Sequence, residues 1–219
     1  MTLNQEQKDL LVGTLLGDGN LQTATKGRTW RYRTLHKFEH KDYLLHKYEV
    51  LKNFCSDDHE PVYDEIFVDR TQQTYKRMYF NTKVADDFRH YGNLFYTLEN
   101  QSQTMIKDVP KNIKQLLTPR AVAYWYMDDG SIKELGRGNA MRICTESFSL
   151  EGVQRLKNAL KELYNVEHTS LNKKTNNQKV VGYRLAIREK SASDFRNLIE
   201  PYLVPCMKYK VSDGFKGHL

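Results

Sequence analysis

Cysteine is scarce in this chain of 219 residues, which contains only Cys55, Cys144 and Cys206. Their number is odd and their spacing is not that of a metal site, so the sequence predicts reduced thiols in an intracellular compartment. Long hydrophobic runs are also absent, because the longest, Leu10–Leu16 and Ala121–Met127, have seven residues each. A bilayer span needs about 20 apolar residues, so no membrane partner is expected. No basic-then-apolar leader indicates secretion.

Low-complexity tracts and Gly/Ser linkers are missing as well, while 14 Tyr, 9 Phe and 2 Trp exclude a disordered chain. The formal net charge is +7 and the isoelectric point is near 9.1. Residues 1–109 contain 15 basic and 16 acidic side chains, whereas residues 110–219 contain 19 and 11. This segregation suggests one basic face and makes nucleic acid the first partner to consider, although an ordinary solvated surface is the alternative.

An approximate internal duplication divides the chain. Residues 10–19 read LLVGTLLGDG and residues 121–130 read AVAYWYMDDG, so two apolar helix-like stretches end in Asp-Gly 111 residues apart. A second pair, ADDFR from Ala85 and ASDFR from Ala192, repeats at an offset of 107. Such a repeat points to two copies of one structural unit.

Hydrophobic periodicity predicts the same order of elements in both copies. Each half reads as a helix, two strands, a helix, two strands and a helix, which gives an α+β fold of two αββαββα halves. The expected boundaries are an N-terminal half at residues 1–98, a connection at 99–118 and a C-terminal half at 119–219. At about 150 residues per domain, the length allows one or two domains.

The two helices that end in Asp-Gly carry the chemistry in this interpretation. Gly13 and Gly17 lie on one helix face, and small residues at this spacing let two helices approach closely. If the repeated helices pack together, Asp18 and Asp129 meet at their ends, where carboxylates oppose the helix dipoles unless cations lie between them. Paired carboxylates in a basic protein favour a divalent metal site for phosphodiester chemistry. The alternative is that each Asp-Gly only ends a helix in a turn.

These stretches, LVGTLLGDG (11–19) and VAYWYMDDG (122–130), resemble the paired motifs of the LAGLIDADG homing endonucleases. LTPRAVAYWYMDDG (117–130) and YLVPCMKYK (202–210) are similar to the single-chain, intron-encoded members of the yeast mitochondrial type. The motif's last Asp is present in both copies. Departures are Tyr124 in place of a Gly, Leu16 and Met127 in place of the first Asp, and Asp128 where Ala or Gly is usual.

The resemblance implies a fold and a DNA-binding surface. The motif helices would form a pseudo-twofold interface, and each half would add a curved, four-stranded antiparallel sheet, so that the sheets form a saddle in the DNA major groove. The basic residues of the predicted strands and turns then become contact candidates: Arg28, Arg31, Arg33, Lys37, Arg70, Lys76, Arg77, Lys133, Arg137, Arg142, Lys173, Lys174, Lys179, Arg184 and Arg188.

The resemblance also implies a catalytic set. Asp18 and Asp129 would ligate Mg²⁺, for which Mn²⁺ substitutes, with help from the backbone carbonyls of Gly17 and Asp128. Further residues match the family's active-site lysines and its water-orienting polar residues, the latter expected at the end of the second strand of each half: Lys107, Lys210, Glu39 and Glu146.

Three functions are compatible with this pattern. The first is a monomeric, site-specific endonuclease that cuts both strands of a long DNA target in an intronless allele and leaves 3′ overhangs. The second is a maturase that binds its host intron RNA, and the third is a transcriptional regulator on the same fold. The presence of both Asp and both Lys favours cleavage. The absence of a leader suggests synthesis where the protein acts, in a mitochondrion, a chloroplast or the bacterial cytoplasm.

Overall fold

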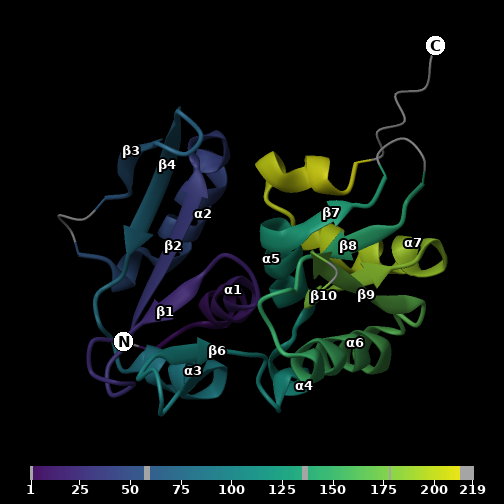
Figure 1. Ribbon diagram of the computed structural model, residues 1–219, viewed down its shortest axis with the longest axis horizontal. Helices are drawn as coiled ribbons and strands as arrows, with labels where there is room; N and C mark the ends of the chain where they lie inside the picture. The colour runs from purple at the N-terminus through teal and green to yellow at the C-terminus, as the bar shows by residue number, and fades with distance from the viewer. Residues whose placement is uncertain (1, 57–59, 135–137, 178, 213–219) are drawn as a thin grey trace.

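The computed structural model describes residues 2–56, 60–134, 138–177 and 179–212. Two halves of similar architecture lie on either side of a central pair of helices, α1 (Gln5–Leu15) and α5 (Pro119–Asp129), which Figure 1 shows at the middle of the molecule. Both helices begin where the sequence offers a cap, because the Asn4 side chain accepts from the N–H of Gln7 and Thr118 caps α5 with Pro119 following. Within the described ranges, no helix is long and apolar enough to cross a membrane.

Both halves have the αββαββα order that the sequence predicts. After α1, the N-terminal half contains β1 (Asn20–Gln22), β2 (Arg31–Lys37), η1 (Phe38–His40), α2 (Lys41–Leu51), η2 (Lys52–Phe54), β3 (Val62–Val68), β4 (Gln73–Asn81) and α3 (Asp87–Phe95). After α5, the C-terminal half contains β7 (Gly130–Ile132), β8 (Met141–Ile143), α6 (Leu150–Tyr164), β9 (Thr169–Asn176), β10 (Lys179–Ile187), α7 (Glu189–Ile199), η3 (Glu200–Tyr202) and η4 (Pro205–Lys210).

The segment between the halves has structure of its own. A short hairpin of β5 (Tyr96–Leu98) and β6 (Met105–Lys107) is followed by α4 (Ile113–Leu116). The expected boundary after residue 98 therefore falls between the two strands of one hairpin. This hairpin matters for the site because its second strand ends at Lys107.

Each half contains one four-stranded antiparallel sheet, with strand orders β1-β2-β4-β3 and β7-β8-β10-β9. The two registers correspond. Asn20, two residues after Asp18, pairs with Arg33, and Ser131, two residues after Asp129, pairs with Arg142. Positions in the second strands of the two halves are thus equivalent at an offset of 109 residues, since Arg33 corresponds to Arg142.

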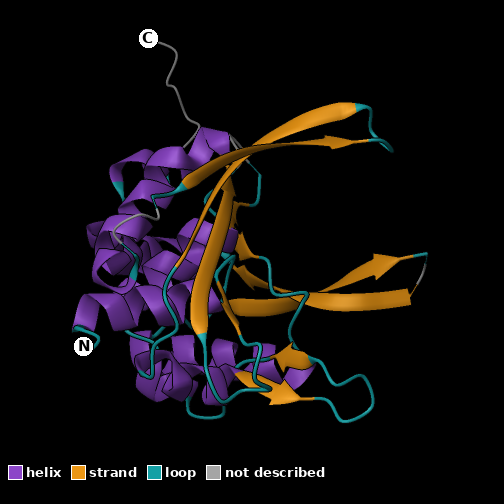
Figure 2. Ribbon diagram, turned by 90° about the vertical axis from the view of Figure 1, so that its left-hand side faces the viewer, coloured by secondary structure: helices purple, strands orange, loops and turns teal. Residues whose placement is uncertain are grey.

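The helices cover one face of the sheets and leave the other open. Figure 2 shows the helices gathered on one side and two long hairpins projecting to the other. Along β2, Tyr32, Thr34 and His36 are buried, whereas Arg31 and Lys37 are exposed. Alternating side chains point to opposite faces of a strand, so the basic residues of β2 lie on the face away from the helices.

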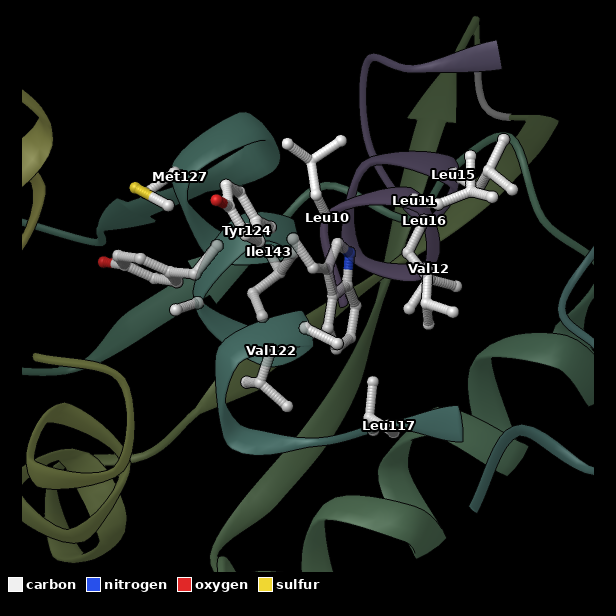
Figure 3. Packing of buried hydrophobic residues seen from close by; sticks show 14 of the residues in the cluster. Leu10, Leu11, Val12, Leu15, Leu16, Leu117, Val122, Tyr124, Met127 and Ile143 are labelled. Atoms are coloured by element: carbon white, nitrogen blue, oxygen red, sulfur yellow. The ribbon is translucent and has the colours of Figure 1, made fainter. Parts of the chain in front are cut away.

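The interface of α1 and α5 forms the centre of the apolar core. Figure 3 shows side chains of both helices, among them Leu10 and Tyr124, in one cluster. A Cβ atom added to Gly13 would lie 2.3 Å from the carbonyl oxygen of Ala121, and one added to Gly17 would lie 2.4 Å from the Cβ atom of Asp128. These glycines therefore permit the close contact of the helices, and the bulky Tyr124 opposite Gly13 makes that contact asymmetric.

Candidate active site

The motif helices end at the junction of the halves, and each end presents an aspartate. Asp18 lies in the turn after α1 with 45% of its side chain exposed. Asp129 is the last residue of α5 and is partly buried. Burial raises the pKa of both carboxyl groups, and the negative charge of Asp18 helps to raise the pKa of Asp129 to about 7. The two carboxylates thus lie close enough to repel each other.

A lysine ammonium group contacts each helix end. Lys107 Nζ donates to the carbonyl oxygens of Gly17 at 3.2 Å and Gly19 at 3.1 Å. Lys210 Nζ, at the end of η4, donates to the carbonyl oxygen of Asp128 at 2.9 Å. Burial lowers the pKa of both ammonium groups, while the nearby aspartates oppose this change. Cations are favourable at helix C-termini, where carbonyl groups lack helical partners.

A third carboxylate, that of Asp128, is buried between the halves. Although Asp128 belongs to α5, its partners belong to the N-terminal half. Its Oδ1 atom accepts from Lys47 Nζ at 2.7 Å and from the Tyr43 hydroxyl at 2.9 Å, both on α2. Its Oδ2 atom accepts from the main-chain N–H of Asp18 at 3.0 Å. The side chains of Lys47 and Asp128 are both 0% exposed, so this is an ion pair removed from water.

His36 of β2 completes this group. Its Nε2 atom lies 2.8 Å from Lys47 Nζ and its Nδ1 atom lies 3.6 Å from Asp18 Oδ2. Burial and the charge of Lys47 lower the pKa of His36 to about 3, so the imidazole is neutral near pH 7. One ligand atom each from Asp18, His36 and Asp128 lie within 4.8 Å of one another. Because Lys47 contacts two of these three side chains, this cluster already contains its own cation.

The ends of α1 and α5 suit a hard divalent cation. Carboxylate oxygens of Asp18 and Asp129 and main-chain carbonyls of Gly17 and Asp128 are the oxygen donors that Mg²⁺ and Mn²⁺ prefer. The raised pKa of both carboxyl groups shows negative charge that a cation would neutralise. Ammonium groups already stand against both carbonyls, so these helix ends attract positive charge.

The two glutamates of the predicted site do not occupy equivalent positions. Glu39 is exposed and lies in η1, beyond the end of β2. Glu146 lies beyond the end of β8, and its carboxylate is paired with Arg184. The strand register makes Lys37, not Glu39, the equivalent of Glu146. The expectation that both glutamates end the second strand is wrong, because the loops after β1 and β7 differ in length.

The predicted DNA contacts separate by position. Strand pairing places one group on the sheet faces away from the helices: Arg31, Arg33, Lys37, Arg77, Arg142, Lys174, Lys179 and Arg184. Lys76 and Lys173 are on the opposite face, next to Arg77 and Lys174 in sequence, and Lys76 pairs with Glu65 at 3.7 Å. Four others lie outside the strands: Arg28, Arg70, Lys133 and Arg188. Arg137 falls outside the described residues.

An open groove of about 1110 Å³ connects the carboxylate end of the site to this basic face. It runs along β1 to the β5–β6 hairpin and is lined by Asp18, Lys26, Arg31 and Lys107, among others. Acidic and basic side chains of the site are therefore accessible from the same open side.

Sequence reasoning missed Lys47, Tyr43 and His36 and assigned Asp128 only a main-chain role. A signal was present, because Lys47 falls in the buried stripe of α2, where the flanking buried residues Leu44 and Leu51 are apolar. A lysine in such a stripe requires a buried anion, and Asp128 is the one motif position where an acid replaces a small residue. The two departures were not connected because the sequence alone does not show that α2 packs on the end of α5.

Comparison with known proteins identifies this arrangement. A model of the LAGLIDADG DNA endonuclease family matches residues 8–195, which is most of the chain. The chain belongs to this LAGLIDADG family. It is 52% identical to the DNA endonuclease I-ChuI of Chlamydomonas applanata over 219 residues, covering 100% of both chains.

Two further LAGLIDADG-like matches bear on fold and function. The cytochrome b mRNA maturase bI2 of Saccharomyces cerevisiae is 28% identical over 213 residues, which are 96% of this chain and 48% of that protein. The solved structure of the homing endonuclease I-WcaI bound to its DNA recognition sequence superposes with a TM-score of 0.82 at 24% identity. That match covers 97% of this chain and 88% of the other, and it shows that the two share one fold.

The metal-free LAGLIDADG site should make stability depend on pH through Asp129. The pKa of this carboxyl rises from 3.8 to about 7 on folding, so the stabilisation present below about pH 4 is lost as the pH rises through 7. Asp129→Asn removes this loss and should unfold at least about 1 kcal/mol later than wild type near pH 8, which is about 2–4 °C.

The difference between wild type and Asp129→Asn isolates this group, because the lowered pKa of His36 changes stability in the opposite direction with pH. Metal-free melting curves from about pH 4 to 8 make the measurement, with the exposed Asp194→Asn on α7 as control. A difference that stays constant across this range would contradict the prediction.

Proposed function

We propose that this protein is a homing endonuclease that cleaves both strands of a DNA target of about two helical turns in an intronless allele and leaves 3′ overhangs. The observation that carries the proposal is the paired site at the ends of α1 and α5. Each helix ends in an aspartate and has a lysine against its terminal carbonyls. One such set for each strand, beside a basic sheet face, is what double-strand hydrolysis requires.

The proposed cofactor is Mg²⁺, with Mn²⁺ as a substitute, held by Asp18, Asp129 and the carbonyls of Gly17 and Asp128. When bound, the metal supplies an activated water and stabilises the leaving 3′ oxygen. Lys107 and Lys210 place positive charge beside the scissile phosphates, where it offsets the negative charge that develops during displacement. Glu39 and Glu146 remain predicted water-orienting residues.

The direct test is cleavage of a supercoiled plasmid that carries the uninterrupted sequence flanking this reading frame. Wild type with Mg²⁺ should convert it to linear DNA, and a plasmid that retains the intron should stay intact because the insertion splits the target. A protein that cuts neither plasmid at any divalent metal concentration would refute the proposal.

The maturase function is the second candidate, and the similarity to the yeast cytochrome b maturase favours it. It would use the same basic surface for intron RNA and would not require the paired aspartates. Binding and splicing of the host intron by wild type, together with failure to cut the uninterrupted plasmid, would promote this function over cleavage.

DNA binding should depend steeply on salt. If six basic residues contact phosphates, log K should fall with log salt with a slope of about −5. Arg33→Gln and Arg142→Gln, at equivalent positions of the two open faces, should each reduce this slope by about 0.9. The matched controls Lys76→Gln and Lys173→Gln, on the opposite faces, should leave it unchanged. Equal effects of all four variants would show that the open faces do not bind DNA.

The protein is expected to act as a monomer, because both motif helices and both lysines of the paired site come from one chain. Light scattering at micromolar concentration should give a mass near 25.8 kDa, with one protein bound per target duplex. Two chains per duplex at saturating, low-salt conditions would contradict this expectation.

A further inference from the structure

We propose that Lys47, His36 and the Asp128 side chain are positioning residues that hold Asp18, and not Asp129, in a fixed orientation, so that the two cleavage sites are inequivalent. The inference rests on the proposed function. It assigns a role to a buried charged group that the reaction itself does not require.

The group has no counterpart in the other half. At the offset of 109 residues given by the strand registers, His36 corresponds to Thr145. The same offset equates Lys47 on α2 with Leu156 on α6, and both side chains are fully buried. The motifs equate Asp128 with Gly17. Thus an ammonium, an imidazole and a carboxylate stand where the other half has a leucine, a threonine and a glycine.

Fold stability does not explain this difference. Removing two charges from water is costly, and a well-packed apolar pair is often as stable as a buried ion pair or more so. The C-terminal half shows that the same architecture forms with Leu156 at this position. The ion pair therefore has a purpose beyond packing, and its contacts indicate which residue it serves.

The Asp128 carboxylate holds the backbone of Asp18. Asp18 lies in the turn after α1, and its main-chain N–H donates to Asp128 Oδ2 at 3.0 Å. The other oxygen of the carboxylate is fixed by Lys47 Nζ at 2.7 Å and the Tyr43 hydroxyl at 2.9 Å. The position of the Asp18 backbone is thereby tied to α2, a rigid element of its own half.

Lys47 also determines which nitrogen of His36 faces the Asp18 side chain. A lysine ammonium only donates hydrogen bonds, so His36 Nε2, 2.8 Å from Lys47 Nζ, must be the acceptor. The proton of the neutral ring then lies on Nδ1, which faces Asp18 Oδ2 at 3.6 Å. An N–H group aimed at a metal-ligating carboxylate orients that ligand, and loss of such a partner costs about 10–100-fold in metal affinity or activity.

The sharpest test copies the arrangement of the other half. Lys47→Leu alone would leave the Asp128 carboxylate buried and unpaired, so the variant to use is Lys47→Leu/Asp128→Ala, which removes both charges. On the uninterrupted-target plasmid with each strand labelled, it should slow cleavage of the strand served by Asp18 about 10–100-fold. The other strand should change by less than about threefold, so nicked plasmid should accumulate. Leu156→Val, a core change in the other half, controls for lost stability and should not alter the ratio of the strand rates.

Two variants of His36 separate positioning from packing. His36→Asn keeps an N–H donor near the place of Nδ1, whereas His36→Leu fills the space without one. His36→Asn should retain more activity on the Asp18 strand than His36→Leu at limiting Mg²⁺, and added Mg²⁺ should narrow the gap. Equal activity of the two variants, or equal slowing of both strands in any of these variants, would overturn the inference.

A measurement on the metal-free and DNA-free protein tests the tautomer directly. In ¹⁵N-labelled protein, long-range ¹H–¹⁵N spectra should show His36 protonated at Nδ1 and unprotonated at Nε2, and Lys47→Leu/Asp128→Ala should shift protonation toward Nε2. An Nε2–H ring in wild type would overturn the inference while leaving the proposed function intact. Failure of wild type to cut the plasmid would instead refute the proposed function.

Discussion

Replacing Asp18 or Asp129 by asparagine should reduce double-strand cleavage at least about a thousandfold, since loss of about 4 kcal/mol of transition-state stabilisation corresponds to this factor. Each change removes a charged oxygen ligand but keeps the size of the side chain. The fold should survive, because the pKa of both carboxyl groups is raised in the metal-free protein and the neutral amide removes that repulsion. DNA affinity should stay within about threefold in the absence of metal, as the basic sheet faces are untouched.

The pattern of residual cleavage carries further information. If each aspartate serves its own strand, Asp18→Asn should nick one strand and Asp129→Asn the other. If a central cation is shared between them, either variant should stop cleavage of both strands. Supercoiled-plasmid assays with strand-specific labels distinguish these outcomes, with the exposed Asp194→Asn as control. Linear product at the wild-type rate from both variants would show that Asp18 and Asp129 only end their helices in a turn.

The repeat predicts most of the architecture because local patterns determine it. Helix α6 and strand β10 occupy the residues that periodicity assigns to them, Leu150–Tyr164 and Lys179–Ile187. Boundaries differ where tertiary contacts decide. Helix α1 ends at Leu15 rather than Gly17, because the N–H of Gly17 bonds the Thr14 carbonyl and the chain turns to present Asp18.

The site could be predicted only in part, for a physical reason. Asp18, Asp129, Lys107 and Lys210 are given by the resemblance of their motifs. The partners of Asp128 cannot be inferred in that way, because they come from α2 and β2 of the opposite half and meet only in the folded chain. Likewise, Lys76 and Arg77 are adjacent in sequence yet lie on opposite sheet faces, which only the register of β4 reveals.

Replacing Lys107 or Lys210 by methionine should slow cleavage about 100–1,000-fold, the usual cost of removing one preorganised electrostatic partner of the transition state. Lys107 contacts the carbonyls of Gly17 and Gly19, at the Asp18 end of the site. Lys210 contacts those of Met127 at 2.5 Å and Asp128 at 2.9 Å, at the Asp129 end. We therefore expect each lysine to share the strand preference of its aspartate.

Stability should respond much less than activity to these lysine variants. A cation at a helix C-terminus contributes about 0.3–1 kcal/mol, up to about 2 kcal/mol when partly buried, so melting should fall by a few degrees at most. Lys208→Met provides the matched control, because Lys208 is exposed in the same η4 segment as Lys210 and should leave both strand rates unchanged. Rates that fall equally for Lys208→Met and Lys210→Met would show that the tail only packs against α5. A fall confined to Lys107→Met and Lys210→Met, each on the strand of its own aspartate, would establish two separate Asp–Lys sets within one chain.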